Sequence, residues 1–384
     1  MNPIVIIGGG LAGYTVAREL RKLDKSVPLT MLMADDGAFY SKPMLSNGLA
    51  QNKTAASLIL SSAEKMASQL LTEIRPHTRV KAMDAAAHRL ELEGPEGSTS
   101  LEYGRLVLAL GADPIRLPIA GDGVDAVLSV NDHADYGVFR EALEGKQQVA
   151  ILGAGLIGCE FANDLAGAGH EVTVYDLAPQ PLGRLLPTGA GQFMANALAA
   201  KGIAWRFGQS ASQVQKDGPC LRLTTVNGQS ESFDLILSAV GLKPRIALAQ
   251  AAGLKTNRGI VVDRCLRTGD PDIFALGDCA EVEGLLLPFV LPLMASARAL
   301  AATLSGTDTP VSYPAMPVVV KTPACPAVVS PPPMGTAGEW QETVTSSGVR
   351  ALFEGQEGEL LGFALLGDAV GEKQALTAKL PAWL

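Results

Sequence analysis

The chain has 384 residues, which is more than one ordinary domain needs and enough for two or three. Its hydrophobic content of 47% and its 41 glycines fit buried parallel sheets joined by many glycine turns. The net charge of −8 argues against non-specific nucleic-acid binding, and no apolar run reaches the length of a membrane span. The first predicted strand begins at residue 4, which leaves no room for a signal peptide. We therefore expect a cytoplasmic protein with no nucleic-acid partner and no membrane insertion.

Four apolar residues and a glycine-rich turn open the chain. Ile4–Ile7 are predicted to form a buried strand, and GGGLAG follows with Gly8, Gly10 and Gly13 at the GxGxxG spacing of dinucleotide-binding turns. The first glycine permits the tight turn, the second lets the backbone approach a pyrophosphate, and the third lets the next helix lie close to the strand. That helix points its free N–H groups and positive dipole end at the phosphates. We therefore predict a nucleotide site here.

The helix after this turn is predicted to be amphipathic. Its apolar face carries Val16, Leu20 and Leu23, and its polar face carries Arg18, Arg21 and Lys22. One face is thus expected to pack on the sheet and the other to face solvent.

Two acids follow the next predicted strand, residues 29–34. An acid about twenty residues beyond the last glycine of such a turn accepts hydrogen bonds from a ribose hydroxyl. We choose Asp35 for that role, with Asp36 as the alternative. The other interpretation is that both acids only begin the turn before Gly37. The glycine motif upstream favours the ribose role for one of them.

A second copy of the glycine motif lies in VAILGAGLIG, with Gly153, Gly155 and Gly158. Two such turns in one chain indicate two nucleotides held face to face, one passing electrons to the other. Asp176 ends the second strand of this unit, where an acid accepts hydrogen bonds from a free 2′-hydroxyl and repels a 2′-phosphate. We therefore expect NADH rather than NADPH, although contact between Arg184 and a phosphate stays open.

The rest of the chain gives the predicted domain organisation. A helix is predicted over residues 57–71 and a strand-rich lobe over the C-terminal part. Asp278 follows a short apolar strand and Gly277, where it can accept hydrogen bonds from sugar-like hydroxyls. We predict an α/β fold with two Rossmann-like dinucleotide-binding domains and a small C-terminal α+β lobe. The predicted divisions are 1–114 and 242–312 for the first domain, 115–241 for the second and 313–384 for the lobe.

Two charged residues have two interpretations each. Lys42 lies in a loop, where a lysine is usually a solvated charge but can pair with a phosphate or with the anionic form of a flavin ring. Glu160 lies in the first turn of the second unit's helix, where the helix dipole alone favours an acid. The alternative is a carboxylate pointed between the two nucleotides, and the pattern does not decide between them.

The cysteines and histidines suggest no metal site and no disulfide framework. Five cysteines are present, at positions 159, 220, 265, 279 and 325, and no two have CxxC or CxxxxC spacing. The four histidines are scattered without ligand spacing. We therefore interpret the cysteines as reduced thiols packed like small hydrophobic residues, and expect no bound metal.

The motifs taken together resemble a known superfamily. GxGxxG at the start, LVLALGA, GxGxxGCE, AVGLKPR and IFALGDCAE occur in the order typical of the two-dinucleotide-binding flavoprotein disulfide reductases, over nearly the whole chain. The resemblance implies FAD at the first site, NADH at the second, and a GD motif that contacts the ribityl and phosphate region of FAD. The implied FAD ligands are Gly8, Gly10, Gly13, Asp35 and Asp278. The implied NADH ligands are Gly153, Gly155, Gly158 and Asp176.

The same resemblance implies further cofactor-binding positions. These are Gly9, Leu11, Ala12, Met33, Ala34, Lys42, Val80, Glu160, Val290 and Lys321. Lys42 and Glu160 are the residues to which it gives catalytic importance. Lys42 and Lys321 are expected to stabilise the reduced ring or the phosphates, and Glu160 is expected to orient Lys42 and a water molecule.

The branch of the superfamily follows from the residues around Lys42. Disulfide reductases carry a CxxxxC pair, and their peroxidase and oxidase relatives carry one redox cysteine where this chain has Lys42. The stretch YSKPMLS is similar to that of ferredoxin reductases of oxygenases, and most similar to that of rubredoxin–NAD reductases. Asn47 departs from the ferredoxin-reductase pattern, which often has lysine there.

The reaction that the resemblance implies is hydride transfer from NADH to FAD, followed by single-electron transfer to rubredoxin. Rubredoxins are usually acidic, so a chain of net charge −8 would need a local basic patch or short-range apolar contact to dock one. Other acceptors stay open, namely a ferredoxin, a flavorubredoxin, or oxygen. A non-enzymatic NADH-binding redox sensor is the alternative of a different class.

Overall fold

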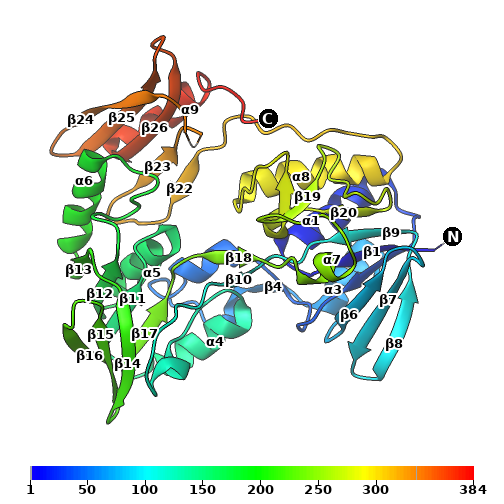
Figure 1. Ribbon diagram of the computed structural model, residues 1–384, viewed down its shortest axis with the longest axis horizontal. Coiled ribbons are helices and arrows are strands. Elements are labelled where there is room, and N and C mark those ends of the chain that lie inside the picture. The colour runs from blue at the N-terminus through cyan, green and yellow to red at the C-terminus, as the bar shows by residue number, and fades with distance from the viewer. Residues whose placement is uncertain (1, 334) are drawn as a thin grey trace.

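The computed structural model describes residues 2–333 and 335–384 and contains two parallel sheets and an antiparallel C-terminal lobe (Figure 1). The predicted α/β fold class is therefore confirmed. The two parallel sheets are built from the two glycine-motif units, and the lobe lies beside the second of them.

The first parallel sheet has the strand order β20-β9-β1-β2-β5. Its strands are β1 (Ile4–Ile7), β2 (Leu29–Leu32), β5 (Glu73–Arg75), β9 (Arg105–Leu108) and β20 (Ile273–Ala275). The central strand β1 is buried along its length, which explains why it is apolar at every position rather than alternating. Helices α1 (Leu11–Leu23) and α8 (Val290–Leu304) pack against each other beside this sheet (Figure 1).

Helix α1 follows the predicted amphipathic pattern with two exceptions. Val16 and Leu20 are fully buried as expected, but Leu23 is 59% exposed at the end of the helix. Arg21 was expected on the solvent face and is instead buried. Its guanidinium donates hydrogen bonds to the carbonyl oxygens of Leu70 (2.5 Å) and Leu71 (2.9 Å). It therefore satisfies carbonyl groups that the end of helix α3 (Ala63–Leu70) leaves without partners.

The segment predicted as one helix over 57–71 is divided in the structure. It contains the end of α2 (Ala55–Leu58), strand β4 (Ile59–Ser61) and helix α3 (Ala63–Leu70). Strand β4 pairs with β3 (Phe39–Tyr40), and Ser62 then caps α3 by accepting a hydrogen bond from Lys65. Tertiary pairing and a local cap thus override the helical pattern, and this part of the prediction is wrong.

The second parallel sheet has the order β13-β12-β11-β17. Its strands are β11 (Gln148–Leu152), β12 (Glu171–Asp176), β13 (Ile203–Phe207) and β17 (Leu235–Ser238). The helices of this unit are α4 (His133–Ala142), α5 (Leu156–Gly167) and α6 (Thr188–Ala199). The unit thus repeats the strand, glycine turn and helix that open the first.

In each unit an antiparallel meander is inserted in the sequence between two strands of the parallel sheet, before β9 in the first and before β17 in the second. In the first unit it is formed by β6 (Arg79–Asp84), β7 (Arg89–Gly94) and β8 (Gly97–Glu102). In the second unit it is formed by β14 (Ala211–Asp217), β15 (Cys220–Thr225) and β16 (Ser230–Phe233).

Two short strands carry the chain between the units. Strand β10 (Ala112–Pro114) leaves the first unit and pairs antiparallel with β18 (Leu242–Pro244), which returns to it. The returning chain forms α7 (Ala247–Ala251), β19 (Ile260–Val262) and β21 (Ala280–Val282) before α8. The predicted divisions at 114/115 and 241/242 fall at this strand pair, and we retain the domain boundaries as a prediction.

The C-terminal lobe is an antiparallel sheet with two faces covered differently. Its order is β22-β23-β26-β25-β24, with β22 (Val318–Val320), β23 (Ala327–Ser330), β24 (Gly338–Val344), β25 (Gly348–Gly355) and β26 (Leu360–Gly367). One face contacts α6 of the second unit, and the other packs around Phe363 with Leu376 of helix α9 (Lys373–Thr377). Helix α6 therefore packs the lobe against the second unit.

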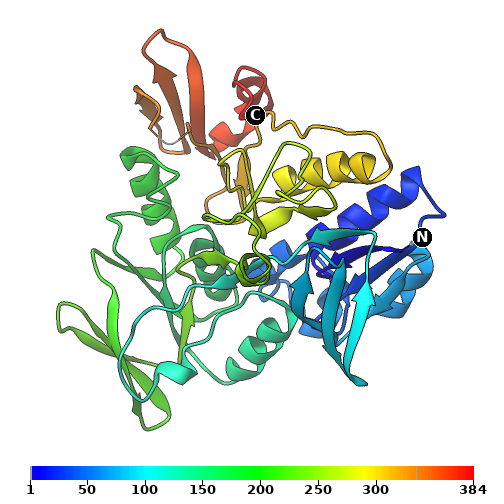
Figure 2. The same cartoon turned by 45° about the vertical axis from the view of Figure 1, so that its right-hand side comes forward.

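The last residues of the chain pack against the first unit (Figures 1 and 2). The N–H of Trp383 donates to the carbonyl of Tyr313 (2.7 Å), and the N–H of Tyr313 donates to the carbonyl of Leu384 (2.9 Å). Tyr313 shares a hydrogen bond with Ser296 of α8 (2.8 Å), and Trp383 packs on the first unit's core. We call Pro381–Leu384 the C-terminal strap, because it ties the end of the lobe to the first unit.

We predict that Trp383→Ala loosens this tie. The loss of partly buried aromatic packing is expected to cost about 1–3 kcal/mol and to speed proteolytic cleavage within residues 305–317, which link α8 to the lobe. Limited proteolysis with mass spectrometry measures this rate. Trp340→Ala is the matched control, because Trp340 packs within the lobe against Phe353. Equal cleavage of the linker in both variants would contradict the role of the strap.

Candidate functional site

The glycine turn after β1 has the geometry that the sequence predicts. Gly8 has φ +116°, and a Cβ there would lie 2.3 Å from the carbonyl oxygen of Ala109. A Cβ on Gly13 would lie 2.0 Å from the carbonyl oxygen of Gly8, so any side chain would force α1 away from the strand. A Cβ on Gly10 would meet nothing within 4 Å, so this residue borders open space at the start of α1. That combination fits a phosphate group held by backbone N–H groups.

The turn after β11 repeats this geometry. Gly153 has φ +104°, and a Cβ on Gly158 would lie 1.9 Å from the carbonyl oxygen of Gly153. A Cβ on Gly155 would meet nothing within 4 Å. Both turns therefore fit a dinucleotide for the same reasons: the first glycine has a positive φ, the second borders open space, and the third lies against a carbonyl oxygen.

The acids after β2 lie at the carboxyl end of that strand, where the prediction placed them. Asp35 accepts a hydrogen bond from the N–H of Gly37 (3.0 Å), and Asp36 accepts one from Ala38 (3.0 Å). Both carboxylates thus shape the turn, and both side chains remain exposed. The turn-forming role is present for both residues, and the ribose role of Asp35 stays a prediction.

The neighbouring predicted positions have different environments. Met33 is buried with its sulfur under Gly9, and its backbone N–H and carbonyl are both hydrogen-bonded to the chain. Ala34 is exposed, and Val80 lies on the edge strand β6 beside a bulge. Met33 therefore packs beneath the glycine turn, whereas Ala34 and Val80 remain available as predicted contacts. Leu11 and Ala12 lie in the first turn of α1.

Asp176 lies at the end of β12 and is hydrogen-bonded to the second glycine turn. Its carboxylate accepts a hydrogen bond from the N–H of Ala154 (2.5 Å) and another from the N–H of Ala178 (2.7 Å). Each oxygen keeps a lone pair for a further donor. The residue therefore anchors the turn and can still receive a sugar hydroxyl.

Asp278 lies beside the first glycine turn, in the short helix Gly277–Cys279. A Cβ on Gly277 would lie 3.0 Å from that of Ala12, so this loop touches the start of α1. Burial raises the pKa of Asp278, and the charge of Lys42 only partly offsets it. Among residues 2–333 and 335–384, no group donates a hydrogen bond to the Asp278 side chain, and such a half-buried carboxylate suits a ligand that brings hydroxyl donors. Val290, at the start of α8, is 41% exposed.

Three units of the chain meet at Glu160. Its side chain is fully buried and forms an ion pair with the Lys321 ammonium. The Ser46 hydroxyl donates to the same carboxylate (2.5 Å), and the backbone N–H of Lys321 donates to its second oxygen (3.0 Å). Lys321 also donates to Ser46 (2.7 Å) and to the carbonyl of Pro43 (2.6 Å). The carboxylate points between the units, so the helix-dipole interpretation alone is insufficient.

Lys42 has a different partner from the one expected. Its ammonium donates a hydrogen bond to the side-chain oxygen of Asn131 (2.7 Å), and Glu160 does not bond to it. The expectation that Glu160 orients Lys42 is therefore wrong, because Lys321 takes both the charge and the position next to that carboxylate. Burial lowers the pKa of Lys42, with the nearby Asp278 charge acting in the opposite direction.

Sequence reasoning missed three residues that hold these groups in place. Ser46 and Asn131 bind the two lysines, and Asp164 accepts hydrogen bonds from the N–H groups of Leu49 (2.8 Å) and Ala50 (2.9 Å). The signal for Ser46 was its place in the YSKPMLS stretch. Asn131 and Asp164 lie far along the chain from their partners, so nothing local marked them.

The described cysteines do not approach one another, and all five are free. Cys159 and Cys279 are fully buried, and burial raises the pKa of Cys279 to about 11. Both thiols therefore lack the properties of a reactive cysteine.

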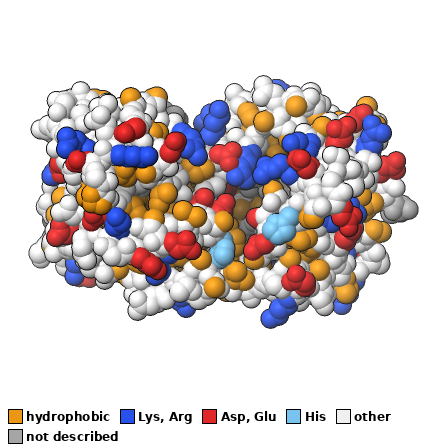
Figure 3. Space-filling model, turned by 90° about the horizontal axis from the view of Figure 1, so that it is seen from below, with side chains coloured by type: hydrophobic (Ala, Val, Ile, Leu, Met, Phe, Trp, Pro, Cys, Tyr) orange, Lys and Arg blue, Asp and Glu red, His pale blue; other side chains and the backbone are white. Residues whose placement is uncertain are grey.

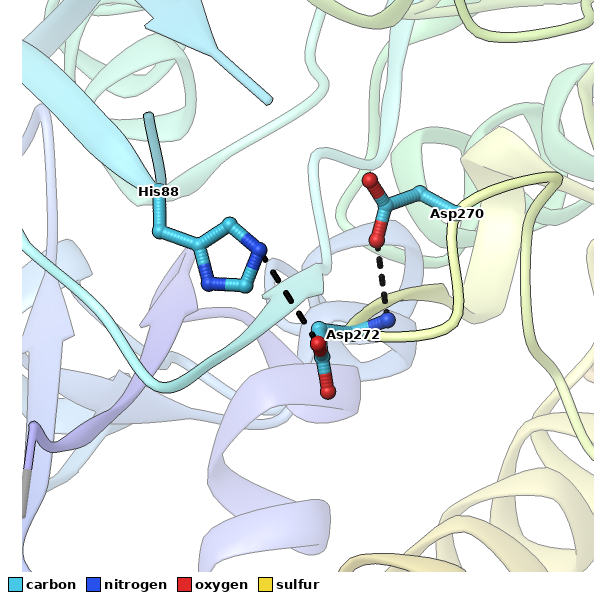
Figure 4. Close-up of side chains that lie close together, drawn as sticks. All are labelled: His88, Asp270 and Asp272. Atoms are coloured by element: carbon cyan, nitrogen blue, oxygen red, sulfur yellow. Dashed lines mark hydrogen bonds and ion pairs between the residues drawn. The ribbon is translucent and has the colours of Figure 1, made fainter. Parts of the chain in front are cut away.

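A cluster of His88, Asp270 and Asp272 lies on the first unit (Figure 4). His88 stacks on Tyr103 and approaches Asp272 at 3.9 Å, while Asp270 accepts a hydrogen bond from the N–H of Asp272 (2.9 Å). All three side chains are partly exposed. These contacts form the turn before β20 and account for the cluster without a ligand.

The face shown in Figure 3 is hollowed near its centre, and acidic, basic and histidine side chains border the hollow. The two signs of charge are interspersed there rather than separated into one field. Among the helices of the described chain, none combines the length and apolar character that crossing a membrane requires.

Two family models match the chain. Residues 2–301 match the pyridine nucleotide-disulphide oxidoreductases, and residues 310–380 match a rubredoxin binding C-terminal domain. The first match spans both glycine turns and Asp278, and the second spans the C-terminal lobe and Lys321.

Similar proteins match over their full length. The Rubredoxin-NAD(+) reductase of Alcanivorax borkumensis is 51% identical, with 100% of this chain and 99% of the relative covered. The protein of the same name from Acinetobacter baylyi is 49% identical, with 99% and 98% covered. The solved ferredoxin reductase of Rhodopseudomonas palustris has a TM-score of 0.89 at 27% identity, with 99% of this chain and 96% of that chain covered. The chain therefore belongs to the pyridine nucleotide-disulphide oxidoreductase family, with both of its nucleotide turns inside the matched region.

Proposed function

We propose that the chain is an FAD-dependent NADH:rubredoxin oxidoreductase. The observation that carries the proposal is the pair of glycine turns of matching geometry, with Lys42 near Asp278 and Lys321 paired with Glu160 of the helix that follows the second turn. The full-length similarity to two rubredoxin-NAD(+) reductases supports it, as does the match of the C-terminal lobe to a rubredoxin binding domain.

The residues present fit the two cofactors. The turn at Gly8–Gly13 and the half-buried Asp278 would hold the phosphates and sugar hydroxyls of FAD, and Val290 would contact it from α8. The turn at Gly153–Gly158 and Asp176 would hold NADH. When bound, FAD accepts a hydride from NADH and releases electrons one at a time. The protein supplies binding, orientation and electrostatics.

Lys42 and Lys321 would stabilise negative charge on a bound group. Lys42 begins the short 3-10 helix Lys42–Asn47 after β3, and Lys321 lies in the C-terminal lobe; each places an ammonium near the meeting point of the units. A fixed positive charge in a partly desolvated site stabilises negative charge that develops on a bound group. Hydride transfer needs no general acid or base, so neither lysine is assigned a proton-transfer role.

No sulfur relay is part of the proposal. Position 42 holds lysine where oxidase relatives carry a redox cysteine, and the thiols of Cys159 and Cys279 are buried and unpaired in the described structure. We infer that electrons pass directly from the flavin to an iron centre of the acceptor. Ferredoxin, flavorubredoxin and oxygen remain the alternatives to be excluded.

Stopped-flow spectroscopy tests the proposal. NADH should bleach the flavin absorbance of the holoenzyme, and a second mix with oxidised rubredoxin should restore it faster than ferredoxin, flavorubredoxin or oxygen does. A chain that binds no flavin, or that turns over with none of these acceptors, would refute it. Slow turnover with every acceptor would favour the sensor alternative instead.

The Asp278→Asn variant is predicted to bind FAD about 10- to 100-fold more weakly, because a charge-assisted hydrogen bond contributes about 1.5–3 kcal/mol. The apoprotein should become more stable at pH 7. Burial raises the pKa of Asp278 above its unfolded value, so the wild-type fold gains relative stability as pH falls through that pKa. The advantage of the variant should therefore shrink in acid.

Fluorescence titration with FAD and thermal unfolding of the apoprotein at several pH values measure both effects. Asp125→Asn is the control, since it removes the same charge from an exposed position. Unchanged FAD affinity in Asp278→Asn would remove this carboxylate from the FAD site.

The Asp176→Ala variant tests the choice of pyridine nucleotide. We expect the wild type to prefer NADH, and the variant to lose about tenfold of the ratio of kcat/KM between NADH and NADPH. The variant also loses hydrogen bonds to Ala154 and Ala178, so KM should rise for both nucleotides. The ratio isolates the sugar contact. An unchanged ratio with a raised KM for both would leave Asp176 only its anchoring role.

A further inference from the structure

The two lysines at the site differ in what neutralises them. Lys321 is ion-paired with Glu160, whose carboxylate is fully buried. Lys42 donates instead to the neutral side-chain oxygen of Asn131, at 2.7 Å. Across residues 2–333 and 335–384, Lys42 forms no ion pair, whereas Lys321 does. The direct partner of Lys321 is therefore a carboxylate, and the direct partner of Lys42 is an uncharged amide.

Asn131 is held so that its oxygen faces Lys42. Its amide nitrogen donates to the carbonyl of Ala112 in β10 (2.9 Å), which fixes which end of the amide is the acceptor. Its backbone N–H donates to the carboxylate of Asp135 (2.9 Å), and its side chain is only 7% exposed. Because every donor of this residue has a defined partner or direction, it holds the lysine in one position.

Other charges surround Lys42 at longer range. Asp278, Asp132 and Asp135 attract its ammonium, and Arg245 repels it. Asp132 caps α4 through the N–H of Asp135, and Asp135 bonds to Asn131, so both carboxylates are already engaged with the backbone. None of these groups replaces Asn131 as the direct partner.

We propose that Asn131 is a positioning residue that holds Lys42 beside the flavin through a neutral hydrogen bond instead of an ion pair, so that the Lys42 ammonium favours the reduced, negatively charged ring. The inference rests on the proposed function. It assigns unequal roles to the two lysines: Lys321 with Glu160 is a neutral pair that joins the units, and Lys42 sets the flavin potential.

Asn131→Asp tests this by replacing one NH₂ group with oxygen at nearly constant shape. The new carboxylate would cancel the Lys42 charge. We expect the equilibrium between reduced and oxidised FAD to shift about tenfold toward the oxidised form, which is about 30 mV to more negative potential for a two-electron couple. Spectroelectrochemical titration of the holoenzyme at pH 7 measures the shift.

Glu160→Gln is the complementary variant, and its predicted shift has the opposite sign. It leaves the Lys321 charge uncancelled, so the potential should become more positive. If the flavin potential shifts in opposite directions in the two variants, general loosening of the site cannot be the cause. If Asn131→Asp does not fold, a positive shift in Glu160→Gln still supports unequal roles, and an unchanged potential refutes them. Asn227→Asp, at an exposed turn, adds the same charge far from the site and should shift nothing.

The outcomes separate this inference from the proposed function. If the wild type binds no FAD, the proposed function fails. If it binds FAD and reduces rubredoxin while Asn131→Asp keeps the wild-type potential, only the role of Asn131 is overturned. A negative shift in both Asn131→Asp and Glu160→Gln would also overturn it, because that pattern marks structural damage.

Discussion

The ion pair between Glu160 and Lys321 is the interaction on which the arrangement of the three units depends. The carboxylate comes from the second unit, the ammonium from the C-terminal lobe, and the Ser46 hydroxyl from the first. Removing Lys321 would leave the fully buried Glu160 carboxylate without compensation, and such a loss typically costs about 3–5 kcal/mol. The pair therefore specifies one relative placement of the units, and helix α6 and the C-terminal strap reinforce it.

The two parallel-sheet units have glycine turns of the same backbone geometry, which fits a phosphate group at the start of the following helix. Gly8 and Gly153 adopt conformations that disfavour a side chain, and Gly13 and Gly158 lie too close to a carbonyl oxygen for a Cβ. The units differ in the acids nearby. Asp176 is tied to its own glycine turn, whereas Asp278 approaches the other turn from a distant part of the sequence. Asp278 thus brings to the first turn a carboxylate that accepts no hydrogen bond from the described part of the chain.

Local spacing predicted the glycine turns, the fold class and the position of Asp176, because these depend on neighbours along the chain. It did not predict Asn131, which lies 89 residues from Lys42 and is held near it by a hydrogen bond from its amide nitrogen to the carbonyl of Ala112 in β10. The helical period predicted that Arg21 faces solvent. In the structure its guanidinium is buried instead, because it donates hydrogen bonds to the carbonyl groups at the end of α3. The sequence identified Lys42, Glu160 and Lys321 as candidate site residues and could not say which of them would pair.

The pairing of β10 with β18 places the exit from the first unit beside the return to it, with Ala112 opposite Pro244. The segment between β10 and β18 is therefore inserted into the chain of the first unit, and its two ends are adjacent in space. A short turn across those ends would reconnect the remaining chain without stretching it. Such an architecture lets one nucleotide module be gained, exchanged or lost while the host sheet stays whole.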